Sequence, residues 1–390
     1  MMSRSRFGYL VWRIASRLVS WHPHYALLRG MGDVLEALGK PEVFSVAVYD
    51  ARMRAVLGPF LLGRQPGPEY DEEIRELAAA MPASDIPDIE KWARQRAEQL
   101  IGDAINSGSP IDVVEGLANP LLLDFVQYYY GVPTEPEFLK QIRSCSSYIF
   151  GLDLLNGPRG HVEAVAAGRA ISDRIDRAIE ERKLEIADGG ASRKDVMTRL
   201  IEGSLSTDRI RDTIGGTVTG TLIPTIGTFL HTLEVLLDLP RAKLESIRHA
   251  ARQGNYQRIR RVAQEAARLK PFPAALFRYT TDDTCLASGK RVKAHKAVML
   301  DTTSANRDRR AVDRPGDFEE DRPAGQRLLF GHDRHRCIGA IDGREIAQTL
   351  LQELATPLLA LPNLRRVRGR PGRLGPLTLS DHLLLEFDPQ

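Results

Sequence analysis

The sequence predicts a mainly α-helical protein that carries a few short β-strands. Apolar residues recur at the helical period through most of the chain from Glu69 to Leu269. From Ala267 onward the pattern changes to short alternating apolar runs separated by turn residues, which are typical of strands. A helical pattern then returns at 341–358. This order favours one long helical body with a small sheet.

The predicted helices end where glycine and proline occur. The longest opens at Ser206, a suitable N-cap, and closes at Pro240, so that it spans 206–239. Pro224 lies in its middle and is expected to bend it. Further helices are expected at 70–81, 89–105, 118–130 and 158–186, and short strands at 44–48, near Val292, at 298–300 and at 377–387.

The bulk composition is that of an ordinary globular protein. Hydrophobic residues make up 43% of the 390 residues and charged residues 27%, which allows a large core. No internal repeat or low-complexity linker divides the chain, so a single domain over 1–390 is expected. The net charge of +3, from 54 basic and 51 acidic residues, is too small to indicate nucleic-acid binding. Three widely spaced cysteines indicate neither disulfides nor a zinc site and favour the cytoplasm.

Residues 1–31 form an atypical N-terminal segment. Its apolar residues recur at helical spacing among several arginines, but the apolar runs are too short to span a bilayer or to form a signal peptide. We favour a helix packed on the body of the protein. An amphipathic helix in peripheral contact with a membrane has the same pattern, so that alternative stays open.

The most specific segment is the loop at 330–339, which reads FGHDRHRCIG. It is expected to lead Cys337 into the start of a helix, where backbone amides and the helix dipole stabilise a thiolate. Its glycines let the backbone approach a flat ligand closely. Without this context, a lone cysteine is more often a small buried hydrophobic residue.

This loop resembles the cysteine-ligand signature of the cytochrome P-450 superfamily. Asp333 replaces the second glycine of the signature, and Asp342-Gly343-Arg344 stands where Leu-Ala-Arg is usual. The residues that match are Phe330, Gly331, His335, Cys337 and Gly339. The resemblance implies a triangular helical body around a buried heme b, with Cys337 as the axial ligand of the iron.

Two upstream elements extend the resemblance. Glu265 and Arg268 share one helical face, and the resemblance implies that they form a buried network with Arg322. It also implies that the two heme propionates bind Arg278, His335 and an arginine on an early helix.

Arg75 is our choice for that early arginine. It stands where bacterial members of the family carry His and Arg four residues apart, with Asp71 in place of the histidine. The stretch 92–96, which reads WARQR, mimics a Trp and Arg pair of other members and is the alternative. Its distance from the turn at 131–133 places it on the next helix, so Arg75 is preferred.

The middle of the long helix departs from the family, where an acid followed by an alcohol delivers protons to bound dioxygen. Counting from either end of the helix puts Ile223 and Pro224 at those positions. A register shifted to 215–219 restores an alcohol at Thr219 but no acid, and it requires an insertion. Pro224 is therefore either a simple kink residue or a sign that the oxidant already contains an O–O bond.

Three functions compete. The leading one is a heme-thiolate enzyme that consumes a peroxide or a lipid-like hydroperoxide. The second is a monooxygenase that hydroxylates a small apolar molecule with dioxygen and a ferredoxin-type partner. Its docking face for an acidic partner would include Arg327, Arg334 and Arg336. Ordinary solvated surface charges give the same pattern, so that alternative stays open. The third is a non-catalytic heme-binding partner protein, against which the retention of Cys337 argues.

The N-terminal region also departs from the family. The hairpin between the first two helices of the family is largely missing, because 25–29 leads almost directly into 32–35. This strip borders the substrate entrance in the family, so a more open pocket, or one covered by a partner, is expected.

Overall fold

The computed structural model describes residue 16 and residues 23–155, 158–190, 193–341, 343–367 and 381–388. The N-terminal helix expected within 1–31 lies outside these residues, apart from Ser16, whose hydroxyl accepts a hydrogen bond of 3.2 Å from Arg29. Helices dominate the described chain, and short strands form three small sheets.

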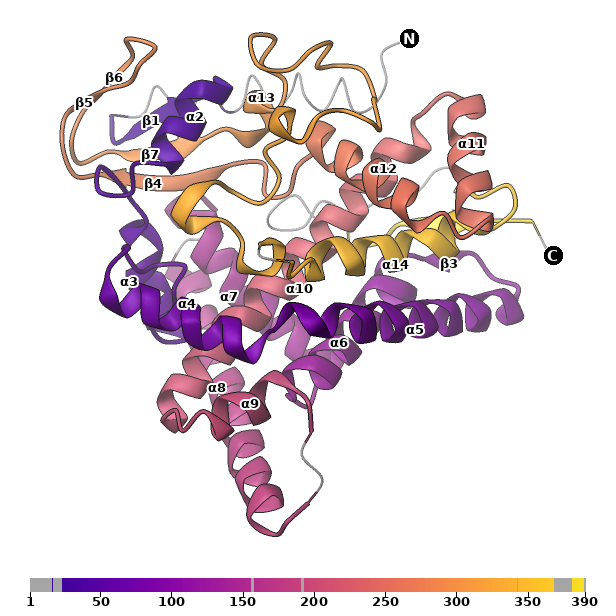
Figure 1. The fold of residues 1–390 in the computed structure, drawn as a ribbon, viewed down its shortest axis with the longest axis horizontal. Coiled ribbons are helices and arrows are strands. Elements are labelled where there is room, and N and C mark those ends of the chain that lie inside the picture. The colour runs from indigo at the N-terminus through magenta and orange to yellow at the C-terminus, as the bar shows by residue number, and fades with distance from the viewer. Residues whose placement is uncertain are drawn as a thin grey trace.

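The helices build a wedge-shaped body. Figure 1 shows α5 and α14 side by side along its long axis, α10 crossing behind them, and α8 with α9 at the narrow end. The helices are α2 Met31–Leu38, α3 Ala47–Val56, α4 Pro68–Ala80, α5 Ile86–Ser107, α6 Asn119–Phe125, α7 Pro136–Leu155, α8 Pro158–Ala187, α9 Val196–Glu202, α10 Thr207–Leu237, α11 Arg241–Arg252, α12 Tyr256–Leu269, α13 Thr302–Ala305 and α14 Ile346–Ala360.

The helical predictions before Cys337 are confirmed with small shifts of their ends. Ser206 caps α10, since its hydroxyl accepts a hydrogen bond of 3.3 Å from the Arg209 amide. The helix expected at 118–130 is α6 with a π-helical turn at each end, and it stops at Gly131, whose φ of 78° leaves the helical region.

The largest sheet has the strand order β1-β7-β4-β2. β1 (Tyr25–Leu28) runs parallel to β7 (Ala297–Leu300), which pairs with β4 (Leu276–Thr280), and β4 pairs with β2 (Phe44–Ser45). The strand predicted at 44–48 is therefore too long. The Ser45 hydroxyl accepts a hydrogen bond of 3.0 Å from the Ala47 amide and turns the chain into α3.

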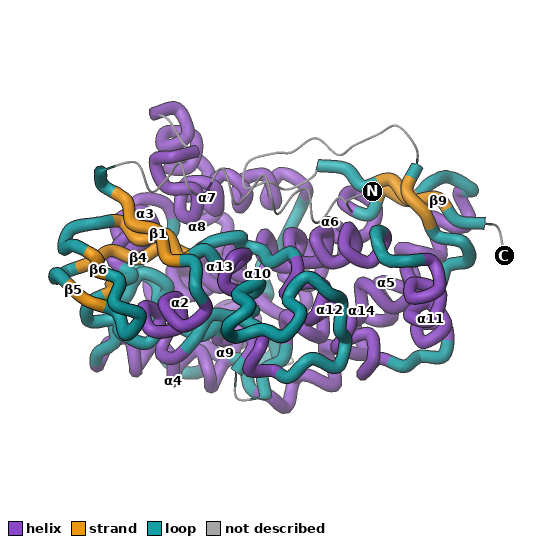
Figure 2. Tube along the Cα trace, turned by 90° about the horizontal axis from the view of Figure 1, so that it is seen from above, coloured by secondary structure: helices purple, strands orange, loops and turns teal. Residues whose placement is uncertain are grey.

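The smaller sheets lie apart from it. β5 (Thr284–Cys285) pairs with β6 (Arg291–Val292), and β9 (Leu384–Glu386) lies between β3 (Ile111–Asp112) and β8 (Arg365–Arg366). Figure 2 places β1 and β4 at one end of the helical body and β9 at the other. Of the strand predicted at 377–387, residues 377–380 lie outside the described residues.

β1 leads into α2 through Arg29 and Gly30 alone, as the missing hairpin predicted. A small apolar core joins α2 to the main sheet, whereas the large core runs from α3 to β9 and contains the buried length of α10. α10 is long and apolar enough to cross a membrane, but 67% of its most apolar window is buried inside the protein. It is thus the central core helix.

Candidate functional site

Hydrogen bonds and glycines shape the loop around Cys337. The Cys337 amide donates a hydrogen bond of 2.8 Å to the Phe330 carbonyl. Gly331 has a φ of 73°, and a Cβ on it would lie 3.2 Å from the His335 carbonyl oxygen. Asp333 keeps a positive φ of 53° where the family has glycine, which aspartate tolerates better than most residues. The loop therefore keeps its tight turn despite the substitution.

Cys337 is exposed as a residue. Even so, burial raises the pKa of its thiol, while a hydrogen bond from the Gly339 backbone and the charge of Arg336 lower it.

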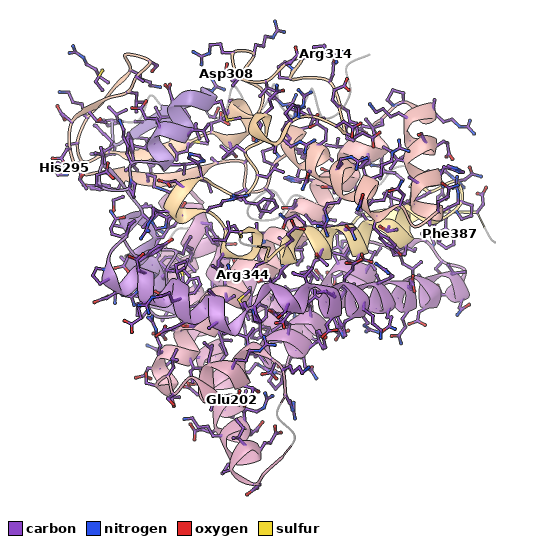
Figure 3. The ribbon with its side chains drawn as sticks, in the orientation of Figure 1. Glu202, His295, Asp308, Arg314, Arg344 and Phe387 are labelled. Carbon is purple, nitrogen blue, oxygen red and sulfur yellow. The ribbon has the colours of Figure 1, made fainter. Side chains whose placement is uncertain are left out.

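The prediction of a helix directly after Cys337 is wrong. Only a 3-10 turn, Ile338–Ala340, follows the cysteine, and α14 begins at Ile346. Gly343, with a φ of 78°, interrupts the chain between them, and Arg344 ties this connection to α4 by donating a hydrogen bond of 3.0 Å to the Met81 carbonyl (Figure 3). Local backbone amides, and not a long helix dipole, are thus the groups that stabilise a thiolate here.

The expected ionic network is present and fully buried. Arg268 Nη2 lies 2.8 Å from Glu265 Oε1, and Arg322 Nε lies 3.1 Å from the same oxygen. Arg268 also donates to the carbonyls of Asn306 and Pro315, so the network fastens the loop before Cys337 to α12.

Arg327 belongs to this network, which sequence reasoning missed. Its Nε lies 3.6 Å from Glu265 Oε2, and its side chain is 7% exposed. The expected docking face therefore loses one member, because Arg327 is turned inward. Arg334 and Arg336 remain exposed beside the cysteine, and Arg334 forms an ion pair with Asp71.

Arg278 is a buried cation without a paired anion among the described residues. It is 5% exposed, and within the described part of the chain no carboxylate lies at ion-pair distance from it. Its Nη1 donates to its own neighbour, the Phe277 carbonyl, at 2.8 Å. Burial lowers the pKa of this guanidinium, which shows the cost of leaving it unpaired. A heme propionate is the anion that fits.

His335 also suits a heme propionate. Its Nε2 is buried without a hydrogen-bond partner among the described residues. Burial, followed by the charges of Arg278 and Arg334, lowers the pKa of His335 to about 4, so the ring is neutral and keeps one N–H to donate.

Arg75 does not reach the site. The buried face of α4 consists of Tyr70, Glu73, Leu77 and Ala80, and at 100° per residue position 75 lies on the opposite, exposed side. The α4 side chain at the site is Tyr70, whose hydroxyl donates to the Arg334 carbonyl and whose ring meets the His335 ring edge-on at 5.1 Å. The apolar period of α4 would have identified Tyr70.

The alternative at 92–96 is also engaged elsewhere. Arg94 Nε lies 3.0 Å from Glu353 Oε2, and Arg96 Nε lies 2.7 Å from Asp124 Oδ2. Both side chains thus tie α5 to its neighbours, α14 and α6.

The centre of α10 presents a narrow open strip. Gly220 is exposed in the middle of this buried helix, and a Cβ on it would meet no described atom within 4 Å. Pro224 and Thr228 follow at one-turn intervals and are partly exposed, whereas Ile223 is 1% exposed and packs in the core. Of the two residues at the family's acid and alcohol positions, Pro224 alone faces the open strip.

Thr219 lies one residue before this strip. Its hydroxyl is buried and has no hydrogen-bond partner among the described residues. Next to the strip, Thr221 Oγ1 donates to the Thr217 carbonyl at 2.9 Å and accepts from the Tyr130 hydroxyl at 2.8 Å. Burial raises the pKa of Tyr130, and the nearby Cys337 charge raises it further. Tyr130 therefore links the centre of α10 to the surroundings of the cysteine.

Comparisons with known proteins agree with this geometry. No family model matches the chain. It is 27% identical over 305 residues to nocardicin C N-oxygenase of Nocardia uniformis, an alignment that covers 76% of this chain and 71% of that enzyme. It is 27% identical over 330 residues to mycinamicin IV hydroxylase/epoxidase of Micromonospora griseorubida, covering 82% and 78%.

The fold is that of solved cytochrome P-450 structures. The crystal structure of CalO2 superposes with a TM-score of 0.81 at 20% identity, over 98% of this chain and 97% of CalO2. A cytochrome P-450 solved in complex with an acyl carrier protein ligated to hexadec-9Z-enoic acid gives 0.81 at 18% identity, over 98% and 99%. The predicted fold class is thus confirmed.

The exposed Cys337 and the open strip of α10 suit a heme between the loop and the helix. So do Arg278, which has no carboxylate partner among the described residues, and His335 Nε2, which has no hydrogen-bond partner among them. Together with the comparisons, they assign the chain to the cytochrome P-450 superfamily, as a heme-thiolate oxidoreductase whose cofactor is heme b.

Proposed function

We propose that Cys337 is the axial ligand of the heme iron and that the enzyme oxidises a small apolar or lipid-like molecule, with a peroxide or organic hydroperoxide as the oxidant. When bound, the heme supplies the chemistry that cleaves an O–O bond and transfers an oxygen atom. The observation that carries the proposal is that the open strip of α10 offers hydrogen-bond acceptors instead of proton donors.

Pro224 creates an acceptor. It has no N–H, so the Gly220 carbonyl, one turn earlier, loses the donor that a regular helix would supply. The Thr228 hydroxyl donates its proton to the Pro224 carbonyl at 2.7 Å. Ile223, at the acid position, is apolar and buried. A hydroperoxide carries its own O–H and needs an acceptor, whereas bound dioxygen needs protons delivered to it.

Other residues are proposed to place the cofactor. Arg278 and His335 would hold the propionates, with Tyr70 packed against His335. Phe330, Gly331 and Gly339 shape the loop that carries the sulfur. Thr219 is proposed to bind a polar group of the substrate, since its buried hydroxyl lacks a partner.

A monooxygenase that uses dioxygen and a ferredoxin-type partner is the second candidate. The names of the two relatives favour it, since one is an N-oxygenase and the other a hydroxylase/epoxidase. Arg334 and Arg336 would then form the docking face for an acidic partner. In either case the proposed location is the cytoplasm, which fits the three free cysteines.

Rapid mixing separates these candidates. The ferric holoprotein is mixed with hydrogen peroxide and with a polyunsaturated fatty-acid hydroperoxide, and peroxide loss is compared with turnover on dioxygen plus a surrogate ferredoxin system. Fast productive loss of a peroxide, with no gain from the redox partners, is expected. Tightly coupled dioxygen turnover, with peroxide only bleaching the heme, would refute the peroxide proposal.

A double variant tests the role of the strip directly. Ile223→Asp with Pro224→Thr restores the acid and the alcohol, so coupled dioxygen turnover is expected to rise severalfold while peroxide consumption slows. The matched control is Pro357→Thr, which removes a proline from inside α14 and is expected to change neither rate. Unchanged rates in the double variant would mean that other groups handle the protons.

A further inference from the structure

Five aromatic rings form a continuous chain through the described structure. Tyr130 contacts Tyr129 at 5.4 Å between ring centroids and Phe125 at 5.9 Å. Phe125 contacts Tyr129 at 5.4 Å and Trp92 at 5.8 Å. Trp92 then stacks on Tyr128 with a centroid distance of 4.7 Å and an interplanar angle of 4°. These are the spacings of directly touching rings.

The inner end of this chain lies at the catalytic region. Tyr130 is 1% exposed, its hydroxyl binds Thr221 on α10, and the charge of Cys337 acts on it. Since Thr221 is the neighbour of Gly220, the first ring of the chain sits beside the open strip of α10.

The outer end opens on the surface. Tyr128 is 41% exposed, and with Tyr129 it lines a pocket of about 400 Å³. Three carboxylates and three cations also line this pocket, so it carries no net charge: Asp85, Asp88, Asp195, Arg193, Lys194 and Arg199. A small neutral molecule with an aromatic ring suits a pocket of this size, charge and aromatic wall.

The Asp85 carboxylate is positioned to accept the proton of the Tyr129 hydroxyl. Its hydroxyl donates a hydrogen bond of 2.9 Å to Asp85 Oδ2. Arg199 holds the same carboxylate by hydrogen bonds of 2.6 and 3.0 Å. When Tyr129 loses an electron, its proton can move to Asp85 along this bond, and it can return when the electron is replaced.

We infer that the chain Tyr130, Tyr129, Phe125, Trp92 and Tyr128 carries oxidising equivalents from the heme site to the surface pocket, where a small phenol is oxidised. The inference rests on the proposed use of a peroxide for its physiological oxidant. One organic hydroperoxide takes up two electrons and two protons and becomes an alcohol and water, whereas hydrogen peroxide becomes two waters. Two phenol molecules supply them, each losing one electron and one proton to become a phenoxyl radical.

Freeze-quench electron paramagnetic resonance tests the path without relying on the natural oxidant. The ferric holoprotein is mixed with meta-chloroperbenzoic acid, whose O–O bond breaks without proton delivery from α10. We expect a protein radical whose spectrum narrows with ring-deuterated tyrosine and loses its Tyr128 part in Tyr128→Phe. In Trp92→Phe the radical is expected to stay on Tyr129 and Tyr130.

The matched control is Tyr279→Phe, a partly exposed tyrosine of β4 outside the chain of rings, which is expected to leave the spectrum unchanged. Tyr128 lies at the surface, so its variant should fold even if a substitution of Trp92 does not. A radical that is unaffected by both Tyr128→Phe and Trp92→Phe, or its absence in the wild type, would overturn the path.

Steady-state oxidation of guaiacol tests the pocket. Trp92→Phe is expected to lower the rate of guaiacol oxidation severalfold while leaving the decay of the peracid unchanged, because the electrons no longer cross from Tyr128. Equal guaiacol rates in wild type and Trp92→Phe would overturn the step through Trp92 and Tyr128, because Tyr129 also lines the pocket and can take the electron directly. A radical with the peracid, but no reaction with peroxides, would refute the proposed oxidant and leave the path intact.

Discussion

At the scale of single residues, Arg278 has opposite effects on the stability of the cofactor-free protein and on heme binding. A guanidinium that is 5% exposed and lacks a carboxylate partner among the described residues destabilises the protein until an anion binds. The heme propionate would provide that anion. Stability of the cofactor-free protein and affinity for heme are therefore opposed at this position.

Arg278→Met is accordingly expected to raise the stability of the cofactor-free protein and to weaken the binding of heme. The cofactor-free variant should unfold at a higher denaturant concentration than the cofactor-free wild type, because a buried unpaired charge has been removed. The heme-loaded variant should lose its heme severalfold faster to excess apomyoglobin, followed by absorbance. Arg75→Met is the control and should match the wild type in both measurements, since Arg75 is exposed. Slow heme loss in Arg278→Met would contradict the propionate assignment.

Arg75 shows how the role of a single residue can be predicted wrongly. The spacing of Asp71 and Arg75 alone matches the family pair. The periodicity of α4 puts Tyr70 and Glu73 on the buried side instead, and the contact of Tyr70 with His335 connects two segments that are distant in the sequence.

At the scale of elements, α3 and α8 meet in backbone contact. Gly168 of α8 lies so close to the Val56 carbonyl that a Cβ would overlap it, and a backbone group cannot move aside. The fit of these two helices therefore depends on the absence of a side chain.

Gly168→Ala is expected to lower the free energy of unfolding by about 1–3 kcal/mol, the usual cost of overpacking. Its control, Gly102→Ala, adds the same methyl group within α5, where a Cβ meets no described atom within 4 Å. That change should raise stability by up to about 1 kcal/mol, because alanine favours helices. Urea denaturation measures both. Equal effects would show that the contact between α3 and α8 is not tight.

Asp212 joins α10 to the loop before α4. It packs against Gly58, whose φ of 86° and lack of a Cβ make room for the carboxylate. Burial raises the pKa of Asp212 to about 6, Arg211 opposes this, and Asp208 and Glu73 add to it. The folded protein therefore binds a proton more tightly than the unfolded chain at this group.

Stability is expected to depend on pH through this residue. With the folded pKa above the unfolded one, the Asp212 contribution to stability falls as pH rises from about 4 to about 6 and stays low above it. Asp212→Asn should thus gain roughly 1 kcal/mol over the wild type above that range, allowing for solvent screening, and little below it. Urea midpoints across the pH range measure the difference, and a gain that grows toward acid pH would contradict it.

At the scale of the whole molecule, we propose that the chain is one cooperative domain. The large core extends from α3 to β9, and the smaller core under the main sheet is fastened to it by the buried network of Glu265, Arg268 and Arg322. The proposed heme site would lie between elements from both cores, since Arg278 belongs to β4 and the open strip to α10.

One unfolding transition of the holoprotein is therefore expected, in which helix content and heme absorbance change together. Circular dichroism and absorbance recorded during the same thermal scan provide the measurement. The variant Glu265→Gln extends the test, because it leaves three buried arginines, Arg268, Arg322 and Arg327, without their counter-charge. It should separate the two signals if the two cores can unfold independently. Two transitions in the wild type would contradict the single domain.

The sequence by itself determined the features that depend on neighbouring residues. The helix ends, the glycine turn at Gly331, the pairing of Glu265 with Arg268 and the loss of a backbone donor at Pro224 are all local, so spacing and residue type are sufficient to predict them. The tertiary structure alone decided which side chains meet across the fold. It turned Arg75 outward and Arg327 inward, ended the helix expected after Cys337, and brought Trp92 of α5 into contact with Tyr128 beyond α6. These outcomes depend on how separate elements pack, because burial on one face of a helix is set by its partner and not by its own residues.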